Sequence, residues 1–308
     1  MASWQILFFK IENNYYKDKN IIITGATSPV GISLVETLNS LGANLLLISH
    51  DETKLQNTFS HLLELDNNEE DEENEEQSDS NNNEKNKNLI QYEIIDLENP
   101  KEINKKYPLC LKKLKAKLDI LLICHGINYY SKIKDCSIEN FDKIMNLNVR
   151  SVFHILSISV PFLKLTKGNC VILSSIESFI PKNQGFLNTT SKSMINSLVQ
   201  NSALELSSFG VRINAVAPSK IKKEEKKDEN NIENNFGMIW SGGSANQSGN
   251  RDGDMHPLGK KLIEKENVVD TILFLASDEA SFITGEIIQN DKGFSINHDL
   301  SFTNDNNQ

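Results

Sequence analysis

The amino-acid sequence predicts an α/β fold with a doubly wound parallel sheet. Two patterns along the chain predict it. Short apolar runs without strong alternation are separated by longer amphipathic stretches, and the first run leads into a glycine-containing turn. Apolar runs of this kind are typical of strands that are buried on both faces. Right-handed crossovers between such strands place helices on each side of the sheet. The chain contains no internal repeat, so we expect a single domain.

The order of the predicted elements follows from these runs. The predicted strands are residues 20–23, 44–48, 89–95, 118–124, 169–174, 211–216 and 286–289. The predicted helices are a first one with Val30, Leu34, Val35, Leu38 and Leu41 inward, followed by 52–65, 101–117, 138–165, 189–209 and 268–277. Ser137 is a predicted N-cap for the helix 138–165. Gly210 stands where a helix C-cap belongs.

The charge of the chain is concentrated in one segment. The 308 residues carry a formal net charge of -10. Ten acidic residues and two lysines leave residues 66–88 with a charge of -8, and the remaining chain with -2. We interpret 66–88 as an acidic low-complexity insert that stays solvated or docks on a basic partner. The nearly neutral remainder has no basic domain for phosphates, which excludes nucleic acid as an expected partner.

Other features exclude further classes. The longest apolar stretch, 152–165, contains Pro161 and Lys164 and is too short to cross a bilayer. The N-terminal extension, residues 1–18, lacks the basic start and cleavage site of a secretory signal. The four cysteines show no CxxC spacing, so an intracellular, reducing and by default cytoplasmic location is expected, although an organelle stays open. The histidines show no metal-binding pattern, and we expect no metal site.

The turn after the first strand carries the first functional signal. It reads Thr24-Gly25-Ala26-Thr27-Ser28-Pro29-Val30-Gly31. A strand, a glycine turn and a helix in succession place helix N–H groups against a dinucleotide pyrophosphate. Gly25 would permit the tight turn and Gly31 the close approach of the helix. Alone, the same residues also fit an ordinary turn between a strand and a helix.

With the motifs that follow, the sequence resembles the short-chain dehydrogenase/reductase family over about residues 19–296. The resemblance implies a single Rossmann-like domain, residues 19–299, that binds NAD or NADP. Its motifs match the outer turn glycines Gly25 and Gly31, the adenine-contacting Asp96, the helix asparagine Asn148, the serine Ser175, the lysine Lys192, the strand end Asn214-Ala215-Val216-Ala217-Pro218 and the closing segment 271–285.

One departure bears directly on catalysis. The family's general acid is a tyrosine four residues before the lysine, and here that position is Asn188. An amide can donate a hydrogen bond to a developing oxyanion but cannot release a proton at neutral pH. The catalytic set implied by the resemblance is therefore Ser175, Lys192, Asn148 and Asn188. Tyr129 and Tyr130 follow the fourth predicted strand, and either is a candidate stand-in phenol or only a loop aromatic.

Further departures fall on the loops expected at the cofactor. Pro29 occupies the place of the family's middle glycine and supplies no N–H, although it also suits a first helical turn. The family's N-N-A-G is Ile123-Cys124-His125-Gly126, in which His125 either titrates or packs as an ordinary histidine. Ser219 follows Pro218 in place of a glycine. The family's closing D-G-G is Asp291-Lys292-Gly293.

The end of the second strand predicts the cofactor. Ser49 stands where an acid would bind the ribose of NAD, and His50 where a basic residue would suit the phosphate of NADP, so NADP is favoured. His50 is equally interpreted as a surface residue. The expected cofactor-binding residues are Thr24, Gly25, Gly31, Ser49, His50, Asp96, Gly126, Lys192 and Pro218.

Two functions remain open from the sequence. In the first, the chain binds NAD(P) with weakened or absent catalysis and acts as a nucleotide-binding or structural subunit of a larger assembly. In the second, it is an active NAD(P)H-dependent oxidoreductase that reduces a carbonyl or an activated double bond with another proton donor. The resemblance implies a homo-oligomer built on the helices 138–165 and 189–209. We expect the variable region 219–257 to select a small-molecule substrate. Within it, Phe236, Met238 and Trp240 form an apolar patch or only anchor the loop. Residues 300–308 are expected to form a tail.

Overall fold

The computed structural model describes residues 15–67, 88–222, 236–238, 256–259 and 262–297. The predicted tail, most of the N-terminal extension, Trp240 and all of the acidic insert except its ends lie outside these residues. The strands are β1 (Asn20–Thr24), β2 (Asn44–Ser49), β3 (Ile90–Ile94), β4 (Ile120–Ile123), β5 (Ile127–Tyr129), β6 (Asn169–Leu173), β7 (Arg212–Pro218), β8 (Phe236–Met238) and β9 (Ile287–Asn290). The α-helices are α1 (Pro29–Ser40), α2 (Glu52–Asn67), α3 (Pro100–Lys113), α4 (Ile138–Met145), α5 (Ser151–Thr166), α6 (Phe186–Leu206) and α7 (Lys265–Ala276).

The main sheet confirms the predicted fold class. It has seven strands in the order β3-β2-β1-β4-β6-β7-β9, and every neighbouring pair is parallel. The chain proceeds outward from β1 to β3 and then returns to the other side of β1 at β4. Ligands of doubly wound sheets bind beyond the carboxyl ends of the strands at such a reversal.

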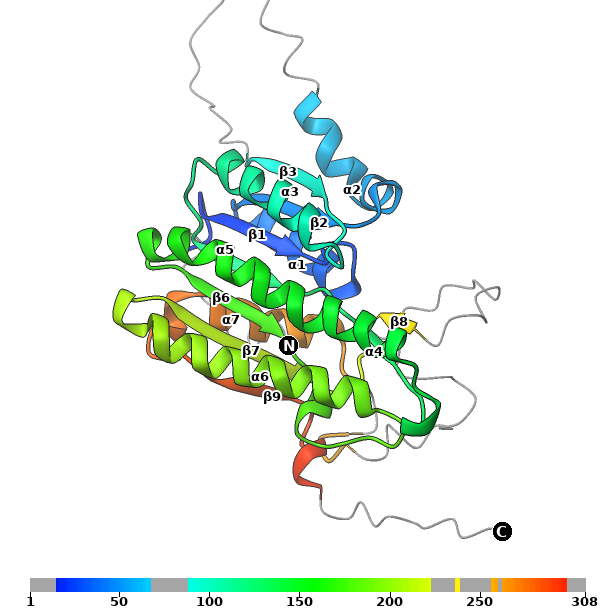
Figure 1. The fold of residues 1–308 in the computed structure, drawn as a ribbon. Helices are drawn as coiled ribbons and strands as arrows, with labels where there is room; N and C mark the ends of the chain where they lie inside the picture. The colour runs from blue at the N-terminus through cyan, green and yellow to red at the C-terminus, as the bar shows by residue number, and fades with distance from the viewer. Residues whose placement is uncertain (1–14, 68–87, 223–235, 239–255, 260–261, 298–308) are drawn as a thin grey trace, which may run out of the picture.

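Helices cover both faces of this sheet. Buried residues of α1, α2 and α7 join one hydrophobic cluster, and those of α3, α5 and α6 join another on the opposite face. Figure 1 shows α5 and α6 in front of the sheet and α7 behind it. Side chains of a strand alternate between the faces, so Ile21 and Ile23 join the first cluster while Ile22 joins the second. Because both faces are apolar, the strands lack polar alternation, as the sequence predicted.

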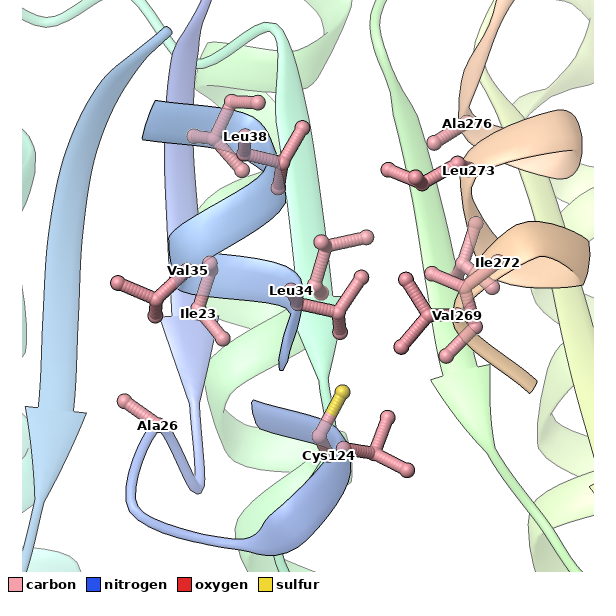
Figure 2. Close-up of a cluster of buried hydrophobic side chains, with 14 of the residues drawn as sticks. Ile23, Ala26, Leu34, Val35, Leu38, Cys124, Val269, Ile272, Leu273 and Ala276 are labelled. Atoms are coloured by element: carbon pink, nitrogen blue, oxygen red, sulfur yellow. The ribbon is translucent and has the colours of Figure 1, made fainter. Parts of the chain in front are cut away.

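Helices α1 and α7 pack against each other in the first cluster. Leu34 and Leu38 of α1 lie opposite Val269 and Ile272 of α7, above the sheet (Figure 2). All four side chains are buried. Helix α7 lies late in the sequence, so this contact ties the end of the domain to its first βα unit.

Three local features differ from the sequence-based expectations. The helix predicted at 138–165 contains a π-helical turn, Asn146–Arg150, between α4 and α5. Helix α6 begins at Phe186 rather than at residue 189, so Asn188 lies in its first turn. A second, two-stranded sheet was not predicted: β5 pairs antiparallel with β8, with Asn128 opposite Gly237. Strands of three residues are too short to leave a period in the sequence.

The ends of the acidic insert are ordered parts of the fold. Asp66 and Asn67 belong to α2. Asn88 donates from Nδ2 to the carbonyl of Asn39 at 2.7 Å, just before β3 begins. The insert therefore joins the main sheet at its edge strand.

The helical run Ile138–Thr166 is long and apolar enough to cross a membrane by length and composition alone. Its inward side chains, among them Val152, Ile155 and Leu163, are buried in the second cluster. That packing is typical of a core helix on a sheet.

We predict that Leu34→Ala lowers the free energy of unfolding by about 2–5 kcal/mol, because the buried site between α1 and α7 cannot collapse fully around the smaller side chain. Urea denaturation followed by circular dichroism measures the effect. Phe282→Ala is the matched control, since Phe282 is 102% exposed. Equal losses in the two variants would contradict the packing described here.

Candidate active site

The turn between β1 and α1 is held by close backbone contacts. Gly25 has a φ of +67°, and a Cβ there would lie 2.7 Å from the backbone nitrogen of His125. A Cβ on Gly31 would lie 2.2 Å from the carbonyl oxygen of Gly25. Both distances are too short for any side chain, so the two glycines predicted from the motif are required by packing.

The start of α1 has fewer free N–H groups than a glycine-rich turn would offer. Ser28 is the N-cap, and its Oγ accepts from the N–H of Gly31 at 3.0 Å. Pro29 is the first helical residue and has no N–H. Among the first three helical residues, Val30 is therefore left to supply an N–H to a ligand.

A cavity of about 500 Å³ opens beside this turn, at the reversal between β1 and β4. Of the predicted cofactor-binding residues, the cavity brings together Gly25, Ser49, His50, Asp96 and Gly126. Thr24, Gly31, Lys192 and Pro218 are not among its lining residues. The remaining lining residues are Thr27, Ser28, Ile48, Leu97, Glu98, Cys124, His125, Ile127, Lys143 and Leu147.

Lys143 is the cationic lining residue that sequence reasoning missed. It lies one helical turn before Leu147, which also lines the cavity. A spacing of four residues places both side chains on one face of the helix. The four-residue spacing between Lys143 and Leu147 is visible in the sequence. Without the position of the cavity, however, that spacing does not distinguish a cavity-lining lysine from an ordinary surface lysine.

His125 is buried and hydrogen-bonded at both ring nitrogens. Nδ1 lies 2.7 Å from Thr24 Oγ1, and Nε2 lies 2.7 Å from Ser151 Oγ. The Ser151 hydroxyl donates to the carbonyl of Leu147, so its oxygen accepts from Nε2–H while Nδ1 accepts from Thr24. Burial, helped by the charge of Lys192, lowers the pKa of His125 to about 3. His125 is thus a neutral packing residue at physiological pH and not a titrating one.

Asn148 holds strand β5 with both ends of its amide. Its Oδ1 accepts from the N–H of Ile127 at 2.9 Å, and its Nδ2 donates to the carbonyl of Ile127 at 2.8 Å. The side chain therefore bonds β5 as a neighbouring strand would. It projects from the π-helical turn, and π turns inside α-helices are frequent at functional sites.

Ser175 and Lys192 lie at the end of β6 and on α6. Ser175 caps the short turn Ile176–Ser178, and its Oγ accepts from the N–H of Glu177 at 3.2 Å, which leaves its own proton free to donate. The ammonium of Lys192 donates to the carbonyl of Leu173 at 2.9 Å. Burial lowers the pKa of Lys192 to about 8, while the charges of Cys124 and Glu177 act in the opposite direction.

Asn188 is 1% exposed, and its amide is partly used for packing. Its Oδ1 accepts from the N–H of Tyr129 at 2.9 Å. Its Nδ2 has no hydrogen-bond partner among the described residues. Asn188 thus holds the last residue of β5 and presents a buried N–H₂ donor.

The two tyrosines after β4 are already bonded to other side chains. The hydroxyl of Tyr129 accepts from Asn140 Nδ2 at 2.8 Å. The hydroxyl of Tyr130 donates to Glu177 Oε1 at 2.7 Å. The pairing of Tyr130 with Glu177 was not expected from the sequence, because the two residues lie 47 positions apart.

Sequence comparisons with known proteins show the family of this chain. A family model described as enoyl-(acyl carrier protein) reductase matches residues 61–295. A chloroplastic tropinone reductase homolog of Arabidopsis thaliana is 26% identical over 90% of this chain and 75% of its own length. Dehydrogenase/reductase SDR family member 4 of Caenorhabditis elegans is 24% identical over 89% of this chain and 94% of its own. The chain belongs to the short-chain dehydrogenase/reductase family of oxidoreductases.

Two solved structures show the same fold. A short-chain type dehydrogenase/reductase from Mycobacterium ulcerans has a TM-score of 0.74 and 22% identity, covering 92% of this chain and 91% of its own. A 3-ketoacyl-(acyl-carrier-protein) reductase from Brucella melitensis, solved with NADH, has a TM-score of 0.71 and 18% identity, covering 91% and 99%. The chain therefore shares the Rossmann-like fold of these two proteins.

We predict that His125 contributes stability that is lost as the pH falls below 6.5, because the unfolded histidine then takes up a proton that the folded one refuses until about pH 3. Between these values the contribution falls by up to about 1.4 kcal/mol per pH unit. Urea denaturation at several pH values gives the free energy of unfolding of the wild type and of His125→Gln. The difference between their pH dependences is the contribution of His125. Identical pH slopes in the two proteins would refute this assignment.

Proposed function

We propose that this protein binds NADP or NAD through the cavity beside α1 and has weakened or absent reductase activity. It would act as a nucleotide-binding subunit, alone or within a larger assembly. The observation that carries the proposal is Asn188, a buried amide at the position of the proton donor, with its oxygen bonded to the backbone of Tyr129. An amide releases no proton at neutral pH, and loss of a general acid typically costs about 10²–10⁴-fold in rate.

The residues present fit a dinucleotide cofactor. Gly25 and Gly31 allow contacts that any Cβ would block, and the cavity beside Gly25 is also lined by Ser49, His50 and Asp96. We assign the pyrophosphate to the start of α1, the adenosine ribose to Ser49 and His50, and the adenine to Asp96. When bound, the nicotinamide would supply or accept a hydride.

The chain's own groups at the reacting end would bind oxygen rather than protonate it. Ser175 has a free hydroxyl proton, and Asn188 has an unpartnered N–H₂ group. Both are donors that hold a carbonyl oxygen by hydrogen bonds. Lys192 supports cofactor binding as a positive charge, buried and held by Leu173.

A second function, an active NAD(P)H-dependent oxidoreductase for a carbonyl or activated double bond, is favoured by one observation. The phenol of Tyr130 is bonded to Glu177, two residues beyond Ser175. This pair would have to deliver the proton that Asn188 cannot. The Tyr130 hydroxyl donates a hydrogen bond to the Glu177 carboxylate and is therefore not directed at a substrate. For this reason we rank this function second.

We also propose a homo-oligomer through the outer faces of α5 and α6. Phe153 and Leu165 on α5, and Met194 and Leu204 on α6, are 57%, 76%, 47% and 79% exposed. Exposed apolar side chains gathered on two helices are typical of an association surface.

We predict that NADPH binds more tightly than NADH, because the end of β2 offers His50 and no carboxylate at Ser49. Fluorescence titration of the bound dihydronicotinamide gives both dissociation constants. Ser49→Asp should reverse the preference by adding an acceptor for ribose hydroxyls and repelling the phosphate. Failure of both cofactors to bind at millimolar concentration would refute the nucleotide-binding function.

We predict that Asn188→Tyr raises the rate of cyclohexanone reduction with NADPH by roughly 10²–10⁴-fold, because it restores an acidic proton near Ser175 and Lys192. Asn188→Phe is the matched control, since it has the same ring without the hydroxyl. NADPH oxidation is measured as the loss of its absorbance at about 340 nm. Rapid wild-type turnover that Lys192→Ala abolishes would instead establish the second function.

A further inference from the structure

Three buried side-chain atoms without hydrogen-bond partners belong to residues at the start of α6 and in the short turn, Ile176–Ser178, that packs against α6. They are Glu177 Oε2, Asn188 Nδ2 and Thr189 Oγ1, out of five such atoms in the described part of the chain. A buried polar atom left unpaired costs about 1–3 kcal/mol, and more when it is charged. Such atoms call for an explanation, and a bound ligand explains three in one place.

Contacts through Tyr129, Tyr130 and Gly185 connect the segments that carry these side chains. Tyr129 donates its N–H to Asn188, and Tyr130 donates its hydroxyl to Glu177. Consecutive residues thus hold the amide and the carboxylate. Thr189 donates its N–H to the carbonyl of Gly185, and Glu177 Oε2 lies 3.6 Å from where a Cβ on Gly185 would be.

The carboxylate of Glu177 is held from several sides. Oε1 accepts from the hydroxyl of Tyr130, and the backbone N–H donates to Ser175 Oγ. The ammonium of Lys182 lies 5.3 Å from the centre of the Tyr130 ring, which helps to fix that ring. These contacts leave Oε2 as the buried oxygen of Glu177 without a hydrogen-bond partner among the described residues.

The chemistry of the unpaired atoms defines the ligand that would satisfy them. Asn188 Nδ2 is a donor and requires an accepting oxygen. Glu177 Oε2 belongs to a carboxylate and requires a donating hydroxyl or ammonium. The hydroxyl of Thr189 can act in either role.

We propose that this cluster binds a small molecule that combines a carbonyl oxygen with a hydrogen-bond-donating hydroxyl or ammonium group. Asn188 holds the carbonyl oxygen, and Glu177 selects for the donating group. The inference rests on the proposed function, because it assigns the second ligand of the same site. Glu177 is the specificity-determining residue of that site.

Three cyclohexanones that differ at one substituent test the proposal. 4-Hydroxycyclohexanone carries a hydroxyl, protonated 4-(dimethylamino)cyclohexanone carries an ammonium N–H, and 4-methoxycyclohexanone carries only an acceptor. Isothermal titration calorimetry is performed on the full chain with and without NADPH. We expect the hydroxyl or the ammonium ketone to bind about tenfold or more tightly than the methoxy ketone, as one charge-assisted hydrogen bond provides. The tighter of the two identifies the donor.

Variants then assign the preference to Glu177. Glu177→Gln should reduce this preference to about twofold or less. Tyr130→Phe, which keeps the carboxylate but removes the donor to Oε1, should reduce it less. Glu93→Gln is the matched control, because Glu93 is a partly exposed carboxylate that pairs with Lys113 at 2.9 Å.

Several outcomes would overturn the proposal. Equal binding of the three ketones, no binding at millimolar concentration, or an undiminished preference in Glu177→Gln would each do so. The ligand series on the wild type decides the matter even if Glu177→Gln does not fold. If NADPH binds but the three ketones bind equally, this inference is refuted and the proposed function stands. If the ketone preference is present but NADPH does not bind, the proposed function is refuted and the ketone site stands.

Discussion

The close approach of the first turn to the end of β4 is the constraint on which the site depends. Gly25 lies so near the backbone of Cys124 and His125 that a methyl group would not fit between them, and Gly31 lies equally near Gly25. This contact fixes α1 against the sheet at the point where the chain reverses. The cavity lies beside this contact and is lined by Gly25 from the first turn and by His125 and Gly126 after β4. His125 strengthens the same contact through its bond to Thr24.

A second constraint acts on β5, which continues the chain beyond this contact. Two asparagines from different helices bind its backbone: Asn148 takes both polar groups of Ile127, and Asn188 takes the N–H of Tyr129. β8 pairs with the same short strand. Asn188 therefore has a packing role, because its oxygen accepts from the backbone of β5. A net contribution of about 0.5–1.5 kcal/mol is ordinary for one such hydrogen bond. The bond from Tyr129 N–H to Asn188 Oδ1 stabilises the position of β5 by about this amount.

The sequence predicted the features that leave a pattern in the chain. All seven strands of the main sheet, the glycine turn and the helical position of Lys192 follow from apolar runs and spacing. It did not predict the π-helical turn, the pairing of β5 with β8, or the bond between Tyr130 and Glu177. These depend on where a side chain points once distant elements have packed, which no local period records. His125 illustrates the difference: its place after β4 was evident, but its neutral state follows only from burial between Thr24 and Ser151.

The same topology separates the described ends of the acidic insert from Ser175 and Lys192. The insert leaves α2 after Asn67 and returns before β3, the edge strand of the main sheet. Ser175 and Lys192 belong to the end of β6 and to α6, and three strands lie between β3 and β6. At about 4.8 Å between neighbouring strands, that is roughly 19 Å. Exposed charges are largely screened beyond about 8–10 Å at physiological salt. The described ends of the insert, in α2 and just before β3, therefore have little electrostatic effect on Lys192.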